Sequence, residues 1–299
     1  MLTRNSAVSI ESEDLKITLN AVTVRYVFRN QRENPVTLTV AFPLPDIDLS
    51  DDANVAFSAD DPLNYVGFST KIDGKPASFT VNQQAFLHGK DVTASLREMA
   101  IPLLPLGKQQ FKVSELPQTV RDRAVAEGLL LQSGTNDKGL ALYDPTWTLK
   151  TSVVRQQTFP PGKSVSVEHR FRTSVGMSFD SVLRQGLRPA KALAADVARY
   201  KSDFCINDDT LKSIDNLAGA DNATNQRLVE RRISYVLKTG ANWAGPIKSF
   251  RLTIDKGQAD RVVSFCGTDV KTISPTAVEM RATDFTPTRD LNIIILGRK

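Results

Sequence analysis

The sequence predicts a mainly β fold with helical insertions, in which helices link two β-sandwich-like domains. Apolar residues recur at every second position in many short segments, which is the period of a strand with one buried face. Turn-forming residues separate these segments at the spacing of β sandwiches. We therefore expect an N-terminal sandwich at residues 1–178 with a helical insertion at about 91–132, a helical connector at 179–222 and a C-terminal sandwich at 223–299.

The first strands are predicted from alternation that changes parity. Apolar residues alternate over 15–19 and again over 22–28, and the change near Asn20 indicates a bulge or a tight bend. A third alternating segment, 36–42, ends at Pro43, because proline has no N–H to give to a neighbouring strand. The sequence therefore begins as a β meander.

A hairpin and several helices follow. The dipeptide Asp73-Gly74 favours a tight hairpin turn, with a strand on each side of it. Asp91 favours a helix start, and helical spacing predicts further helices over 114–131, 187–200 and 208–217.

The C-terminal domain is predicted from renewed alternation. Apolar side chains alternate over 233–237, 250–254 and 291–295, and glycine-containing turns lie between these segments.

Composition excludes some classes of function. The 299 residues carry a formal net charge of +5, and the basic residues are scattered among acidic ones. A nucleic-acid-binding protein would show a basic stripe with stacking aromatic residues, and the sequence has neither. No apolar run reaches the roughly 18–20 residues that a transmembrane helix needs. We therefore expect neither a nucleic-acid partner nor a transmembrane segment.

The two cysteines, Cys205 and Cys266, allow two interpretations. They are either reduced thiols in the core or the two halves of one disulfide. They lie too far apart for a zinc knuckle, and no histidines accompany them. We expect no metal and no cofactor.

His169 is the most informative polar residue. It shares parity with Val165, Val167 and Phe171, so its ring should face the apolar side of its strand. It is either a core histidine with a hydrogen-bond partner, a polar anchor in a pocket or a general base. One histidine alone makes neither a catalytic triad nor a metal site, so we assign no catalytic residue.

Four further residues are predicted to bind a ligand. Trp147 and Trp243 stand near strand ends, where an indole either plugs a seam between domains or stacks on a ring of a ligand. Tyr235 belongs to an alternating segment, and Arg231 either meets an anionic ligand or lies on a solvated face.

The stretch from Asp46 to Asp52 resembles the first half of a calcium loop, because oxygen-bearing residues stand at alternate positions. Asp51 occupies the place of the glycine turn, and Phe57 that of the final glutamate. The stretch is therefore either a looser calcium site or a solvated acidic loop.

Several phrases together resemble one bacterial family. They are RYVFRN at 25–30, FPPG at 159–162, SYVLKT at 234–239, VSFCG at 263–267 and FTPTRDL at 285–291. With them, essentially the whole chain is similar to the domain of unknown function 4424 family. Its members usually follow an export signal, which implies a periplasmic protein shown here without its signal peptide. Its paired Phe-Cys segments imply a Cys205–Cys266 disulfide, and its uncharacterised activity implies no catalytic residue.

Two functions are consistent with these observations. The first is an exported, periplasmic, non-catalytic protein that binds a small ligand or an envelope protein. The second is a hydrolase of unrecognised type that uses His169 with a carboxylate. The sequence has no nucleophile-elbow serine and no phosphate-binding glycine loop to define a third.

Overall fold

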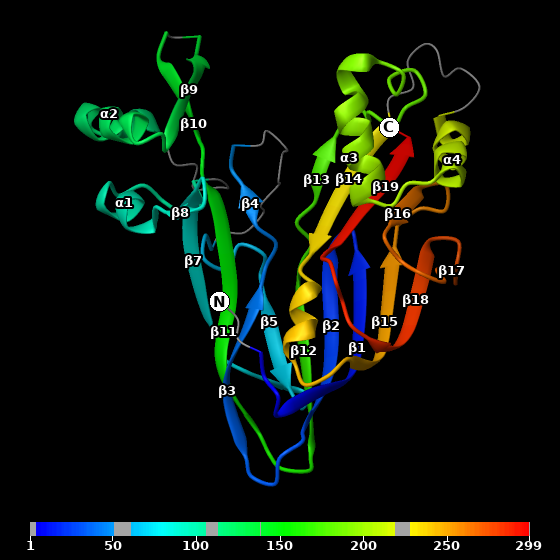
Figure 1. Cartoon of the computed structure of the whole chain (residues 1–299). Helices are drawn as coiled ribbons and strands as arrows, with labels where there is room; N and C mark the ends of the chain where they lie inside the picture. The colour runs from blue at the N-terminus through cyan, green and yellow to red at the C-terminus, as the bar shows by residue number, and fades with distance from the viewer. Residues whose placement is uncertain (1–3, 51–60, 106–112, 138, 219–227, 299) are drawn as a thin grey trace.

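The computed structural model describes residues 4–50, 61–105, 113–137, 139–218 and 228–298, and strands form most of its regular structure (Figure 1). This confirms the predicted mainly β class. The helices are few, and they lie at the outside of the sheets (Figure 1).

The largest sheet has eight strands and joins both halves of the sequence. Its order is β17 (Lys271–Thr272), β18 (Ala277–Phe285), β15 (Ile247–Asp255), β1 (Val8–Thr18), β2 (Ala21–Asn30), β12 (Ser164–Arg172), β5 (Ser69–Ile72) and β6 (Lys75–Pro76). The junction is a parallel pair of β1 and β15, in which Leu15 stands opposite Leu252. Hydrogen bonding therefore continues from N-terminal strands into C-terminal ones.

A second sheet packs against the β2–β12–β5 part of the first. Its order is β3 (Val36–Pro43), β11 (Thr148–Phe159), β7 (Thr80–Leu87) and β8 (Lys90–Asp91), with β4 (Ile47–Asp48) also paired to β11. Aromatic rings meet between the two layers: Phe28 and Phe159 have centroids 5.6 Å apart, and Phe42 and Phe171 5.7 Å apart. These two sheets pack face to face as a sandwich, to which the first sheet also contributes C-terminal strands.

A third sheet is buried on both faces. Its order is β13 (Gly176–Ser178), β14 (Leu228–Tyr235), β19 (Leu291–Arg298) and β16 (Val262–Phe265). Ile293 and Ile295 of β19 join the main core, whereas Ile294 and Leu296 join a second core with two helices. These helices are α3 (Ala194–Asp203) and α4 (Asp208–Ala218), and the short turn η2 (Lys191–Leu193) precedes them (Figure 1).

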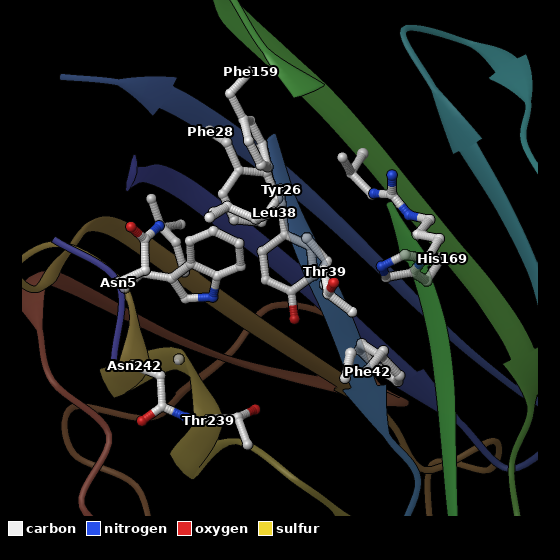
Figure 2. A pocket seen from close by; sticks show the side chains of 17 residues that line it. Asn5, Tyr26, Phe28, Leu38, Thr39, Phe42, Phe159, His169, Thr239 and Asn242 are labelled. Carbon is white, nitrogen blue, oxygen red and sulfur yellow. The ribbon is translucent and has the colours of Figure 1, made fainter. Parts of the chain in front are cut away.

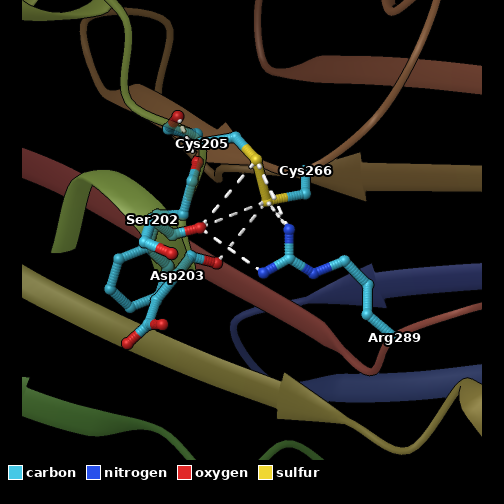
Figure 3. Close-up of a disulfide and its surroundings, with 7 residues drawn as sticks. Ser202, Asp203, Cys205, Cys266 and Arg289 are labelled. Carbon is cyan, nitrogen blue, oxygen red and sulfur yellow. Dashed lines mark hydrogen bonds between the residues drawn. A yellow bond between two sulfur atoms is a disulfide. The ribbon is translucent and has the colours of Figure 1, made fainter. Parts of the chain in front are cut away.

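A disulfide joins the helical connector to the third sheet. Cys205, just after α3, bonds to Cys266, just after β16, so the predicted disulfide is confirmed (Figure 3). The Arg289 guanidinium lies beside it, with Nη1 3.1 Å from the Cys266 sulfur. The bridge closes a sequence separation of 61 residues, which strongly restricts the unfolded chain.

The helical insertion is shorter and more varied than predicted. It contains α1 (Thr93–Glu98), η1 (Val113–Glu115), α2 (Gln118–Ala126) and a hairpin of β9 (Leu130–Thr135) and β10 (Ala141–Pro145) that projects from the body (Figure 1). The predicted helix over 114–131 ends early because Gly128 has a φ of 71°, and the chain then becomes extended. Asp91 supports the start of α1 by accepting the Thr93 N–H at 2.9 Å.

Two other predicted elements differ from the structure. The helix expected over 187–200 becomes regular only at Ala194, because Pro189 disfavours a helical backbone at the residue before it. The turn at Asp73-Gly74 is confirmed, with φ of 49° and 79°. Its return strand is short, however, and β7 pairs with β11 in the second sheet instead.

The sheets cross the predicted domain limits. One eight-stranded sheet and one main core contain residues from both 1–178 and 223–299. The division into these domains and the 179–222 connector stays a prediction. Within the described ranges, no helix has both the length and the apolar character required to cross a bilayer.

Candidate functional site

A cavity of about 300 Å³ lies between the first two sheets, at the side where β3 forms the edge (Figure 2). Strands β1, β2 and β12 supply one wall, and β3 and β11 supply the opposite wall. The short helix η3 (Lys238–Asn242) and the residue after it form the rim. The volume falls near the lower end of the ~300–1,000 Å³ range of small-molecule sites.

Aromatic rings line much of this cavity. Tyr26 and Phe28 face inward because they share the buried parity of β2, and Phe159 faces them from β11. The Trp243 ring lies 4.5 Å from that of Phe28 and 6.1 Å from that of Phe159. Such a wall favours an apolar or aromatic ligand body.

His169 contributes a buried imidazole to the same cavity. It is 5% exposed, and its ring centroid lies 4.9 Å from Phe42 and 5.1 Å from Phe68. Burial, together with the nearby positive charge of Arg155, lowers its pKa to about 3. Its Nδ1 has no hydrogen-bond partner among the described residues. The imidazole is therefore neutral and has an unused polar atom.

Arg155 is the cation of the cavity. It occupies an inward-facing position of β11 opposite Val40 of β3, and its side chain is partly buried. Its Nη1 donates to the side-chain oxygen of Gln157, and burial lowers its pKa from the ordinary value. Guanidinium groups nevertheless stay charged in proteins. Within the described part of the chain, no carboxylate forms an ion pair with it at 4.0 Å or less.

A buried acidic cluster lies below η3. Glu13 of β1 is 2% exposed, and a methyl carbon at Gly240 would stand 3.9 Å from its Oε2. The Tyr26 hydroxyl lies beside this carboxyl and 3.0 Å from the Tyr235 hydroxyl. Burial raises the pKa of Glu13 to about 8, which the Tyr26 hydroxyl offsets only in part. Glu13 is therefore largely protonated near neutral pH.

The structure brings together three of the five residues predicted to bind a ligand. His169 and Trp243 line the cavity. Tyr235 does not line it, but its hydroxyl lies 3.0 Å from the hydroxyl of Tyr26, which does. Trp147 lies elsewhere: it is 0% exposed, and its Nε1 donates to the Leu103 carbonyl at 2.9 Å. The ligand-binding role of His169, Trp243, Tyr235 and Trp147 stays a prediction.

Arg231 also lies outside the cavity. It stands on β14 opposite Met177 and Ile295, in the third sheet. Burial, and then the charge of Arg261, lowers its pKa. Its position gives it no contact with the aromatic wall described above.

Sequence reasoning missed Arg155 and Glu13, although parity marked both. Arg155 shares the inward parity of Val153 and Phe159, and Glu13 shares that of Leu15. A charged residue at an inward position of an alternating strand is the signal that could have found them.

The predicted acidic loop is described only in part. Asp46 pairs with Lys150 at 2.9 Å, and Asp48 accepts hydrogen bonds from the N–H and hydroxyl of Ser50. Asp51, Asp52 and Phe57 lie outside the described residues. Over the ranges that are described, no cluster of three or more His, Cys, Asp or Glu side chains is arranged to hold a metal ion.

The fold and the cavity define a layered β protein with an internal cavity between two sheets. The chain belongs to the family described as a domain of unknown function, DUF4424, whose sequence model matches residues 1–294. No curated protein matches the chain.

Some solved structures have a similar arrangement. A candidate nutrient binding protein from Legionella pneumophila is 13% identical with a TM-score of 0.49, over 98% of this chain and 68% of that one. An M1 zinc metallopeptidase from Deinococcus radiodurans is 8% identical with a TM-score of 0.31, over 98% and 43%. Yeast LTA4 hydrolase is 9% identical with a TM-score of 0.33, over 97% and 29%. The chain thus spans less than half the length of these two enzymes, and scores this low carry no argument about function.

Proposed function

We propose that this protein is an exported, periplasmic, non-catalytic binding protein that holds a small molecule in the cavity between its first two sheets. The observation that carries the proposal is a cavity with an aromatic wall and polar atoms left without partners. Nδ2 of Asn5 and Nδ1 of His169 are buried and unpartnered in the described structure, and both residues line the cavity. Buried polar atoms are normally hydrogen-bonded, so a ligand would supply partners that the chain does not.

Export is supported by the disulfide. Disulfides persist in oxidising compartments such as the bacterial periplasm and are rare in the cytosol. The Cys205–Cys266 bridge closes a long stretch of chain, as structural disulfides of exported proteins do. The same family resemblance that implied an export signal is now supported by the family match over residues 1–294.

Hydrolysis has weaker support. A general base works best with a pKa near the working pH, and burial lowers the pKa of His169 to about 3. In the described residues, no hydrogen bond or ion pair joins this imidazole to a carboxylate. Binding therefore agrees better with the site than proton transfer does.

A thermal-shift assay tests the binding function. The oxidised full chain is mixed with fractions of a bacterial periplasmic extract, together with the variant Trp243→Ala, which opens the aromatic wall. Phe179→Ala is the matched control, because Phe179 is 54% exposed and lies outside the cavity. We expect at least one fraction to raise the melting temperature of the wild type and of Phe179→Ala, with a clearly smaller rise for Trp243→Ala. Equal rises in all three proteins, or none in any, would contradict the proposal.

A further inference from the structure

Arg155, like Arg231 and Arg261, is a partly buried arginine that forms no ion pair with a carboxylate in the described structure, and of these three it alone lines the cavity. Arg184 pairs with Asp180 at 2.9 Å, and Arg188 contacts both oxygens of Asp215 at 2.6 and 2.8 Å. Arg155 has only the neutral amide of Gln157. Because a desolvated charge is costly unless it is paired, the guanidinium of Arg155 is suited to receive an anion from outside the chain.

The rest of the cavity leaves this positive charge unopposed. Its described lining contains no Asp and no Glu. Glu13 lies beside the cavity below η3, but burial raises its pKa to about 8, so that it carries little negative charge near neutral pH. His169 adds no second cation, because its pKa is about 3. The cavity therefore offers a single positive charge.

The position of that charge sets the form of the ligand. Arg155 and His169 lie on facing strands, and the aromatic group of Phe28, Phe159 and Trp243 lies elsewhere on the cavity wall. One guanidinium matches one carboxylate, since its parallel N–H groups fit two carboxylate oxygens. A dianionic phosphate would call for more donors than a single arginine gives.

We infer that the ligand is a small monoanion with an apolar or aromatic body, whose carboxylate pairs with Arg155 while its body packs against the aromatic wall. This rests on the proposed binding function and names the class of ligand for the same cavity. His169 lines the same cavity, and its Nδ1 is buried without a partner in the described structure.

Three probes with one body and different charges test the inference. They are phenylbutyrate, phenylbutyramide and phenylbutylamine, titrated by calorimetry into the full oxidised chain. We expect phenylbutyrate to bind at least about tenfold more tightly than the amide, which is the effect of one charge-assisted hydrogen-bonded pair, and the amine to bind most weakly. Arg155→Gln should lower the affinity for phenylbutyrate to that for the amide and leave the amide affinity within about twofold.

Controls separate the role of Arg155 from folding and from net charge. Arg170→Gln removes an exposed cation of β12 in the facing sheet, outside the cavity, and should leave the preference for the acid unchanged. Arg155→Lys keeps the charge without the paired N–H groups and should keep part of the preference, which gives a readout even where the glutamine variant unfolds.

The possible results are distinguishable. Equal binding of acid and amide, or an equal loss of both in Arg155→Gln, overturns the ligand class while the cavity remains a binding site. Binding of none of the three probes, combined with no response to extract fractions, overturns the ligand class and the proposed function together.

Discussion

Two buried glutamates in this protein have opposite surroundings. Glu230 of β14 is 1% exposed, and its Oε1 accepts a hydrogen bond from the Tyr200 hydroxyl at 2.7 Å and lies 3.4 Å from the Arg232 guanidinium. Glu13 of β1 is buried to the same degree, yet it has two phenol neighbours and no cation. The Tyr26 hydroxyl is the hydrogen-bonding group beside its carboxyl.

The difference bears on the binding site that we propose. Glu230 lies between the third sheet and α3, where Arg232 also donates to the Tyr200 hydroxyl at 2.8 Å. A cation and a hydrogen bond to Oε1 are therefore supplied within the chain, although Oε2 has no partner in the described structure. Glu13 lies beside the cavity, where Arg155 has no carboxylate partner and Nδ1 of His169 has no hydrogen-bond partner in the described structure. Buried polar atoms without partners also occur elsewhere in the described structure, as at Arg184 and Arg231, but those beside the cavity lie where the proposed ligand would supply partners.

The largest expected effect comes from removing the cation beside Glu230. Arg232→Met leaves the Glu230 carboxylate buried without a cation, and we expect a loss of about 3 kcal/mol in the free energy of unfolding at pH 7. Urea unfolding followed by circular dichroism measures it.

The double variant Arg232→Met/Glu230→Gln is the control for that experiment. It removes the buried charge as well as its partner, so most of the lost stability should return. A single variant as stable as the wild type would mean that Glu230 needs no internal cation, and the contrast with Glu13 would disappear.

The surroundings of Glu13 should show the opposite effect: removing the charge of this glutamate should raise the free energy of unfolding. The folded protein holds the proton of Glu13 up to a pKa of about 8, whereas the unfolded chain releases it near the ordinary value of 4.5. Stability from this group is therefore full below about pH 4.5, falls as the pH rises to 8, and then stays constant. Glu13→Gln should match the wild type at pH 4 and exceed it on the order of 2 kcal/mol at pH 9, as measured by urea unfolding.

Glu11 provides the matched control on the same strand. Partial burial acts to raise its pKa, but hydrogen bonds from Lys248 and Ser9 outweigh this and lower it. Glu11→Gln should therefore give no gain in stability at high pH. An equal gain from both variants would indicate a general effect of removing negative charge instead of the burial of Glu13.

Much of this fold could be predicted from local pattern. Period-two alternation marked most strands, and parity alone placed His169 on the buried side of β12. The same rule places Glu13 and Arg155 at inward-facing positions of their strands. It does not distinguish a paired charge from an unpaired one. That distinction depends on contacts that alternation does not show: Arg155 meets the neutral Gln157 of its own strand, and Glu13 meets Tyr26 of β2.

Long-range pairing left no local mark in the sequence. Nothing in the segment of β1 indicates that it pairs with β15 in parallel, or that β7 leaves the hairpin with β5 for the second sheet. Trp147 shows the same limit: its segment alternates correctly, but only the packed structure places its indole against the Leu103 carbonyl, away from the cavity. The disulfide pairing came from family resemblance, because spacing alone allowed two free thiols.

The smallest expected effect concerns His169, whose contribution to stability depends on pH in the opposite sense to that of Glu13. Its folded pKa of about 3 lies below its ordinary value of 6.5, so the unfolded chain takes up a proton that the folded protein excludes. Stability from this group is complete above about pH 6.5 and falls as the pH drops towards 3. His169→Phe, which suits the aromatic surroundings, should reduce the loss of stability between pH 7 and pH 5 by roughly 1 kcal/mol, measured by urea unfolding.

His88→Asn is the matched control for this slope, because His88 is exposed in a turn with a φ of 49°, a conformation that asparagine tolerates. It should leave the slope between pH 7 and pH 5 unchanged. An unchanged slope in His169→Phe would mean that the imidazole accepts a proton inside the folded cavity. The cavity would then hold two cations beside each other at pH 5, a single carboxylate would no longer match its charge, and proton transfer by His169 would regain support.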